Sequence, residues 1–134
     1  MNLKPLLLIP TLGLVCLLSA CAGPMPKADP SEAWIGLQGQ SSDNLMAERV
    51  DGQRVDDGRY FEVAPGKHNL ELTLIQGANG DSDQPECTGH VEYDQFKAGK
   101  QYHLVESGSG SDVGAILVND HGKQVAQSHL FSCI

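Results

Sequence analysis

Apolar and polar residues alternate with a period of two along the stretch that follows Pro65-Gly66. Leu70, Leu72 and Leu74 fall on one side of this stretch, and polar residues occupy the positions between them. The alternation predicts a half-buried antiparallel β-strand. The Pro-Gly pair predicts a tight turn before it, because proline fits the second position of such a turn and glycine supplies the positive φ of the third.

Short apolar or alternating stretches recur along the rest of the chain, and turn-forming residues separate them. Residues 44–50 contain helix-favouring side chains, but the stretch is too short for a stable helix, so we expect a strand. The expected strands cover residues 34–37, 44–50, 59–63, 69–74, 87–95, 101–106 and 113–118, after which 123–126 lead back toward the C-terminus. The chain is therefore predicted to be all-β, an antiparallel β-sandwich or small barrel of about seven strands.

An apolar run from Leu6 to Ala20 follows Lys4 and ends at Cys21. A basic residue, an apolar run and small residues before the cleavage site are the layout of a bacterial export signal. Leu18-Ser19-Ala20-Cys21 resembles a lipobox, the motif of bacterial lipoproteins. The resemblance implies cleavage before Cys21, a diacylglycerol on its thiol and an acyl chain such as palmitate on its amino group.

An ordinary signal peptide and an uncleaved membrane anchor are the alternatives to this interpretation. A transmembrane helix needs about 20 apolar residues, and Pro10 and Gly13 interrupt a run that is shorter than that. We therefore expect a lipoprotein signal peptide at 1–20, a lipid-anchored linker at 21–32 and a β-sandwich domain at 33–134. The three prolines of the linker predict an extended spacer that holds the domain about 30 Å or less from the bilayer.

The residue after the cysteine is Ala22 rather than aspartate. A residue other than aspartate at this position resembles the signal for passage to the outer membrane in Gram-negative lipoproteins. It implies a protein of the cell outer membrane that faces the periplasm or the cell surface. The membrane contact would be made through the lipid on Cys21.

The length and the charge of the chain limit the classes of function. Removal of residues 1–20 takes away Lys4 and lowers the formal net charge from -8 to -9. A balance this acidic argues against nucleic acid and against binding to anionic lipid headgroups. The mature chain has room for one domain with a hydrophobic core and is too short for two.

Cys87 and Cys133 are the two cysteines that remain beyond the signal and the lipidation site. In an oxidising envelope we expect them to form a disulfide, which would stabilise the fold by about 4 kcal/mol on the chain-entropy model. The alternative is a zinc site built from Cys87-x-x-His90 and His129-x-x-x-Cys133. An extended strand would place Cys87 and His90 on opposite faces, so we expect the disulfide and no metal or other cofactor.

Two polar loops carry the other candidate chemistry. Asp81, Ser82, Asp83 and Glu86 could contribute oxygen ligands to calcium, but Pro85 and the absence of a suitably placed glycine favour a solvated loop. Residues 107–111 place a serine between glycines and lack the apolar residues that would fix a nucleophile on a strained turn. We therefore predict a flexible hairpin loop at 107–111 and no catalytic residues.

Aromatic residues and histidines are the remaining candidates for a binding site. Trp34, Tyr60 and Phe61 could form an exposed patch for a glycan or a protein, but in a chain with few aromatic residues we expect them in the core. The histidines fall on polar faces or in turns, and we expect them to be solvated: His68, His90, His103 and His121.

Two stretches, residues 60–70 and 87–104, resemble a group of small proteobacterial lipoproteins of unassigned function. Those proteins carry a Pro-Gly-x-His hairpin, here Pro65 to His68, and later a Gly-x-x-Tyr strand, here Gly99 to Tyr102. The first stretch also resembles the hairpin of PEGA-type β-sandwich modules of surface proteins. The resemblance implies a β-rich fold and an envelope location, and it transfers no catalytic residue.

The sequence thus predicts a non-enzymatic lipoprotein of the cell envelope that binds or helps to assemble another envelope component. Its partner would be an envelope protein or a glycan. One alternative is a binder of a metal or small ligand that uses His90, His129 or the loop at 77–86. Another is an inhibitor of a cell-wall hydrolase, since membrane-bound lysozyme inhibitors share the size, the anchor and one disulfide, although their serine- and glycine-rich motif is not evident here.

Overall fold

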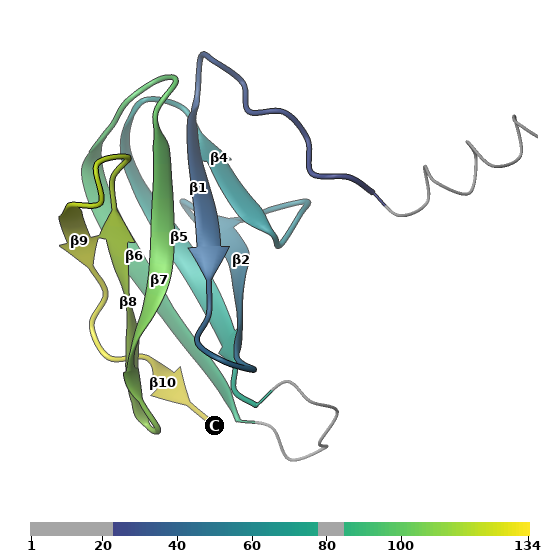
Figure 1. Cartoon of the computed structure of the whole chain (residues 1–134), viewed down its shortest axis with the longest axis vertical. Helices are drawn as coiled ribbons and strands as arrows, with labels where there is room; N and C mark the ends of the chain where they lie inside the picture. Colours follow the sequence, from purple (N-terminus) through teal and green to yellow (C-terminus); the bar gives the residue numbers. More distant parts are fainter. Residues whose placement is uncertain (1–22, 78–84) are drawn as a thin grey trace, which may run out of the picture.

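Two five-stranded β-sheets pack face to face in the computed structural model, which describes residues 23–77 and 85–134. Figure 1 shows β1 and β7 of one sheet in front of β5 and β6 of the other. The described residues contain no helix, and the sheets do not close into a barrel. The predicted all-β fold is confirmed, and of the two architectures the sandwich is the one observed.

The first sheet has the strand order β4-β1-β7-β8-β9, and the second has the order β10-β6-β5-β2-β3. The strands of the first sheet are β4 (Tyr60–Val63), β1 (Ala33–Gln38), β7 (Gln101–Ser109), β8 (Asp112–Val118) and β9 (Gln124–Gln127). Those of the second sheet are β10 (Ser132–Cys133), β6 (Glu86–Phe96), β5 (Gly66–Ile75), β2 (Asn44–Val50) and β3 (Gln53–Arg54).

The structure differs from the expectation in the number of strands and in the direction of one strand pairing. The described residues form ten strands, because the short β3, β9 and β10 add to the seven expected ones. β1 and β7 pair in parallel, with Trp34 opposite Gln101, whereas every other pairing is antiparallel. Alternation along a strand specifies its two faces but not its neighbours, so a pairing between residues far apart in the sequence leaves no local signal.

The core lies between the sheets and follows the alternation of the sequence. Leu70, Leu72 and Leu74 of β5 are fully buried, as the pattern predicted. Each such side chain contributes about 1.5–3 kcal/mol of transfer free energy when it leaves water. The largest fully buried partners of these leucines are Ile35, Phe61, Val91, Leu104, Val113 and Leu117.

The predicted disulfide between Cys87 and Cys133 is confirmed. The two cysteines lie directly opposite each other where β10 pairs with β6. The last residue, Ile134, donates its backbone N–H to Glu86 O at 3.0 Å and accepts from Glu86 N at 3.3 Å. The C-terminus is therefore held at the edge of the second sheet by a covalent bond and by backbone pairing.

The segment 107–111 is not the flexible loop that its composition predicts. β7 continues through Ser109 and β8 begins at Asp112, so only Gly110 and Ser111 form the turn. Gly108 adopts a φ of 80° inside the strand, and a Cβ at this position would lie 2.0 Å from Asp112 O. The glycines that suggested mobility instead allow the tight pairing of the two strands.

The described part of the linker, residues 23–32, contacts the domain, whereas its prolines predict an extended spacer that does not pack. Arg59 Nη1 donates to Gly23 O at 2.9 Å, and Asp29 N donates to Glu62 Oε2 at 2.9 Å. Both partners in the domain lie in or next to β4. The predicted signal peptide and Cys21 lie outside the described residues. Within the described ranges, no helix has the length and hydropathy of a membrane span.

Candidate functional site

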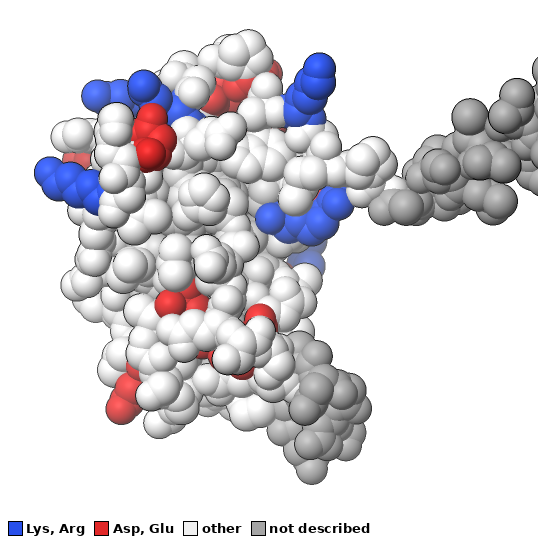
Figure 2. Space-filling view, in the orientation of Figure 1, with Lys and Arg blue, Asp and Glu red and all other residues white. Residues whose placement is uncertain are grey.

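The outer face of the first sheet, which is turned away from the second sheet, carries almost no charge. Residues that lie opposite each other on neighbouring strands form rows across this face. The central rows, from β4 toward β9, are Glu62-Trp34-Gln101, Tyr60-Gly36-His103-Val118-Gln124 and Gln38-Val105-Ile116-Gln127. Glu62 is the only Asp, Glu, Lys or Arg in these rows. Figure 2 shows this face largely white at its middle, with most charged side chains near its ends and margins.

The outer face of the second sheet is different in character. Arg49 and Glu71 form a salt bridge at 2.7 Å on this side, and Arg54 pairs with Glu48 at 3.2 Å. Charged side chains of both signs thus cover the second sheet. The neutrality of the first sheet is a property of one face and not of the whole surface.

Trp34 of β1 and Tyr60 of β4 form the aromatic part of the neutral face, at the β4 edge of the sheet. Their rings stack with centroids 4.2 Å apart and planes inclined by 9°. Both side chains are half-buried, whereas Phe61, the next residue after Tyr60, points into the core. The expectation of a core position is therefore right for Phe61 and wrong for Trp34 and Tyr60. Burial raises the pKa of the Tyr60 phenol, so its hydroxyl stays protonated near neutral pH.

His103 of β7 lies over Gly36 of β1, its neighbour in the same row. A Cβ placed on Gly36 would be 3.1 Å from His103 Cδ2, so glycine is what allows the ring to lie this close to the sheet. Within residues 23–77 and 85–134, the His103 ring has no side-chain or backbone partner at hydrogen-bonding distance, and His103 is exposed as predicted. Its ring nitrogens are available to a ligand.

Two hollows on this side of the molecule meet at Gln101. The smaller, of about 220 Å³, lies between residues 28–32 of the linker, the Trp34 side chain and the β6–β7 turn at 99–101. The larger, of about 410 Å³, is lined by Gln38, Gln101, His103, Val105, Val118 and residues of the β8–β9 turn. Gln101 lines both hollows, so they are neighbours on the surface, and we call the two together the Trp34 groove.

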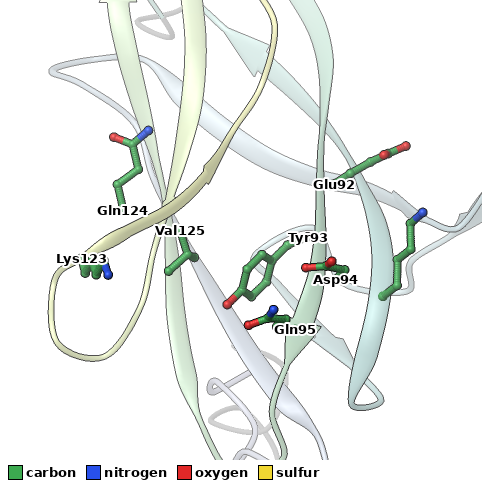
Figure 3. Close-up of a pocket in the computed structure, with 8 residues that line it drawn as sticks. Glu92, Tyr93, Asp94, Gln95, Lys123, Gln124 and Val125 are labelled. Carbon is green, nitrogen blue, oxygen red and sulfur yellow. The ribbon is translucent and has the colours of Figure 1, made fainter.

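A third hollow lies at the open edge of the sandwich, between β6 and β9. It measures about 630 Å³, and Figure 3 shows the Tyr93 and Val125 side chains directed into it from the two strands. Its remaining lining residues are Lys67, Glu92, Asp94, Gln95, Lys123 and Gln124. Tyr93 packs edge-on against Phe96 at 4.9 Å, and burial raises the pKa of its phenol. This hollow is a shallow gap between sheet edges with charges of both signs on its rim.

The predicted metal ligands do not come together. The disulfide uses both sulfurs of the proposed zinc site, and His90 and His129 are both exposed. Among the described residues, no three His, Cys, Asp or Glu side chains are grouped closely enough to hold a metal ion. Asp81, Ser82 and Asp83 of the calcium alternative lie outside the described residues, and Glu86 is exposed at the start of β6.

Two polar clusters were not predicted from the sequence. Glu106 of β7 is 3% exposed, accepts from Gln40 N at 2.8 Å and shares a hydrogen bond with the Asp43 side chain. His68 contacts Asp51 Oδ2 through Nδ1 at 2.6 Å and Ala64 O through Nε2 at 2.7 Å, so it is not solvated as expected. Tyr102, Leu104 and Glu106 are alternate residues of one strand and therefore share its inner face. This spacing is a signal that could have identified the buried acid.

Comparisons with protein-family models, with curated proteins and with solved structures give no match. Functional inference for this chain therefore depends on its own residues. Of its surfaces, the Trp34 groove combines an indole, amides and an unpaired imidazole, and its charged lining residues are Asp29, Glu32, Lys100 and Asp120. That combination suits a ligand without negative charge that has both hydrogen-bonding and apolar groups.

Proposed function

We propose that this protein is a non-enzymatic, lipid-anchored binding or assembly module of the bacterial cell envelope, with the outer face of the first sheet as its contact surface. The observation that carries the proposal is the neutral face that includes Trp34 and Tyr60 in a chain of net charge -8. Contact with water alone does not disfavour charged side chains on a surface. Burial against a partner does disfavour them.

The composition of the face supports this role. The fully buried parts of protein interfaces are depleted in charged residues and enriched in tryptophan and tyrosine. Trp34 and Tyr60 provide these anchors, and Val105, Ile116 and Val118 extend the apolar area along β7 and β8. Apolar surface of this kind on a small soluble domain commonly marks an interaction site.

The envelope location depends on the N-terminal sequence. Leu18 to Cys21 resemble a lipobox, and residues 60–70 and 87–104 resemble small envelope lipoproteins with PEGA-like hairpins. The disulfide between Cys87 and Cys133 suits an oxidising compartment. The partner would be an envelope protein or glycan, and the membrane would be reached through the lipid on Cys21. The acidic charge argues against a nucleic acid partner.

The other two predicted functions have weaker support. A metal binder would need ligands that converge, and His90 and His129 do not. Inhibition of a cell-wall hydrolase remains a hypothesis based on size and anchor, and no feature of the described residues favours it over general binding. A lysozyme assay would test it directly.

Crosslinking in intact cells tests the proposed function. A photoreactive amino acid at Gln38, on the neutral face, is expected to capture an envelope component. The same group at Thr88, an exposed residue of β6 in the second sheet, is the control and is expected to capture much less. Equal capture from both positions would contradict the choice of face. Radiolabelled palmitate should label the wild-type protein and not Cys21→Ser; an unlabelled wild type would contradict the anchor.

A further inference from the structure

We propose that the Trp34 groove binds a neutral saccharide chain. This inference rests on the proposed function, because it takes the same face as the contact surface, and it adds the chemical class of the ligand. The relevant observations are the aromatic wall at Trp34, the amides and imidazole along the groove, the net acidic charge of its lining and the pairing of the underlying strands.

Trp34 forms an aromatic wall of the smaller hollow, and Tyr60 stacks against the indole and fixes its orientation. The face of an aromatic ring is electron-rich and attracts positively polarised hydrogens. The C–H groups on one face of a sugar ring meet this requirement, whereas the ring hydroxyls point outward from it. Trp34 can therefore support a sugar ring laid against the wall of the hollow.

The hydrogen-bonding groups come second. Gln38, Gln101 and His103 line the larger hollow and are all exposed. A glutamine amide donates and accepts at once, and a neutral imidazole does the same through its two nitrogens. Sugar hydroxyls also donate and accept, so each such side chain can serve neighbouring hydroxyls of one ring. Gln101, which lines both hollows, would contact two successive sugars.

The electrostatics favour a neutral saccharide over an acidic one. A polyanion would approach a chain of net charge -8 and meet no cation in the central rows of the face. Of the charged residues that line the groove, Asp29, Glu32 and Asp120 are acidic, and Lys100 lies 3.9 Å from Asp120. The lining is therefore net acidic, which also opposes an anionic ligand.

The sizes of the hollows favour a chain of small units. Sites for drug-sized ligands measure roughly 300–1,000 Å³. The hollow of about 220 Å³ beside Trp34 is smaller and suits a single ring, and the hollow of about 410 Å³ extends the path beyond Gln101. A ligand that fills both is a chain of at least two such rings.

A peptide strand fits this surface less well. Peptides that add to a sheet use free backbone N–H and C=O groups at an edge. β1 and β7 both have hydrogen-bonded neighbours on each side, so the groove offers side chains only. The same pairing makes the groove rigid, which reduces the entropy lost when a ligand binds.

Fluorescence of Trp34 provides a direct readout, because it is the single tryptophan in the chain. We suggest titrating the full-length protein, in a detergent without sugar groups, with β1,4-linked tetramers of N-acetylglucosamine and of glucose. Saturable change of the emission with at least one of these neutral probes, and no saturation with a tetramer of galacturonate, is the expected result. No saturable response to either neutral tetramer would overturn the inference.

Matched variants test the assignment of the groove. Gln101→Ala should weaken binding about fivefold, the effect of a hydrogen bond that contributes about 1 kcal/mol. Thr88→Ala, on β6 of the second sheet, should bind like the wild type. Trp34→Ala should abolish binding measured by calorimetry while Trp34→Phe retains part of it, and thermal unfolding of both variants will show whether they fold. Unchanged affinity in Gln101→Ala would contradict the site.

The outcomes separate this inference from the proposed function. If neither neutral tetramer binds but a crosslinker at Gln38 captures an envelope protein, the saccharide inference is wrong and the proposed function stands. If a tetramer binds through Gln101 but no crosslinks form in cells, the groove is a saccharide site and the assembly role is wrong.

Discussion

Glu106 shows how one buried acid can set the pH dependence of a small domain. Its carboxyl is held in the core between Gln40 N and the Asp43 side chain, and burial raises its pKa above the ordinary 4.5. A hydrogen bond between two carboxyl groups requires a proton on one of them. The raised pKa places this proton on Glu106, and loss of it would leave two carboxylates in contact.

The first prediction concerns the substitution Glu106→Gln. A raised folded-state pKa means that the stability contributed by the proton is complete below pH 4.5 and is lost as the pH rises through the folded pKa. The amide of glutamine donates to Asp43 without titrating, so the variant should gain on the order of 1 kcal/mol over the wild type once the pH exceeds the folded pKa of Glu106, and little at acid pH. Thermal unfolding against pH measures this difference. The control Glu92→Gln, at an exposed position, should follow the wild type; an E106Q curve parallel to it would contradict the prediction.

Glycine is required at position 89 of β6 for a different reason, because the space above it is filled and leaves no room for a side chain. Phe131 crosses this position, and a Cβ added to Gly89 would lie 2.1 Å from Phe131 Cδ1. Phe131 is 5% exposed and belongs to the core, so its ring cannot move away freely. The contact joins the segment before β10 to the inner face of β6.

The second prediction follows from this contact. Gly89→Ala should lower the free energy of unfolding by about 1–3 kcal/mol, the usual cost of overpacking a core. Thr88→Ala, the exposed neighbour on the same strand, should have a much smaller effect. Urea denaturation of the three proteins gives the comparison. A Gly89→Ala protein as stable as Thr88→Ala would show that Phe131 can shift at little cost.

At the scale of elements, His68 and Asp51 connect two turns of the second sheet. Asp51, at the β2–β3 turn, accepts from Asn69 N at 2.8 Å, and His68 lies between Asp51 and the Ala64 carbonyl of the β4–β5 turn. Both ring nitrogens face acceptors, so a doubly protonated His68 can donate to both. The histidine of the Pro-Gly-x-His hairpin is thus a structural contact between turns.

The third prediction uses the carboxylate of this contact. The Asn69 N–H, followed by His68, lowers the pKa of Asp51 below its ordinary 3.8. A lowered pKa contributes stability above pH 3.8 that is lost as the pH falls through the folded value. Asp51→Asn keeps a residue that tolerates the φ of 51° at this position. Because half of the side chain is exposed, the loss near neutral pH should be about 1 kcal/mol or less. The difference from the wild type should vanish at low pH, whereas Asp56→Asn should show no such dependence.

The elements also show what the sequence could and could not predict. Leu70, Leu72 and Leu74 alternate with polar residues, so the face of β5 that is buried followed from the pattern alone. In β1 and β4 both faces carry large apolar or aromatic residues, so Trp34 and Tyr60 could not be assigned to a side from their type. Gly36 and Gln38, which share a face with Trp34, were the available signal for the outer side.

The groove was beyond sequence analysis for another reason. Trp34, Gln101 and His103 come together because β1 and β7 pair in parallel across more than half of the domain. Residues 28–32 complete the smaller hollow, although the prolines of the linker predicted an extended spacer that does not pack on the domain. Neither the parallel pairing nor the docking of the linker has a local pattern, since both depend on contacts between distant residues.

At the scale of the whole molecule, the linker determines how close the domain lies to its proposed anchor. Only Ala22 lies between Gly23 and Cys21 along the chain, so two steps of at most about 3.5 Å each place Cys21 within about 7 Å of Gly23. If Cys21 carries lipid, the contact of the Arg59 side chain with Gly23 O therefore ties the start of β4 to the neighbourhood of the lipidated residue. The Trp34 groove, which the linker helps to form, would lie beside the membrane and not at a distance from it.

The fourth prediction tests whether Arg59 holds the linker in this position. Arg59 donates to Gly23 O at 2.9 Å while its ion pair with Asp57, which lowers the pKa of Asp57 to about 2, fixes the guanidinium. Arg59→Ala should release the linker and speed tryptic cleavage at the exposed Lys27, because cleavage follows the population of the released form. Mass spectrometry of the early cleavage products measures the rate at Lys27 alone.

Arg54→Ala is the matched control, because Arg54 pairs with Glu48 on the second sheet at 3.2 Å and does not contact the linker. It should leave the rate at Lys27 unchanged. Asp57→Asn should fall between the control and Arg59→Ala, since it weakens the support of the guanidinium but keeps the donor. If Arg59→Ala and Arg54→Ala are cleaved at the same rate, the linker is held by its remaining contacts, of which Asp29 N to Glu62 is the strongest candidate. A linker released by Arg59→Ala would also open the wall of the smaller hollow, so the same variant should weaken saccharide binding at Trp34.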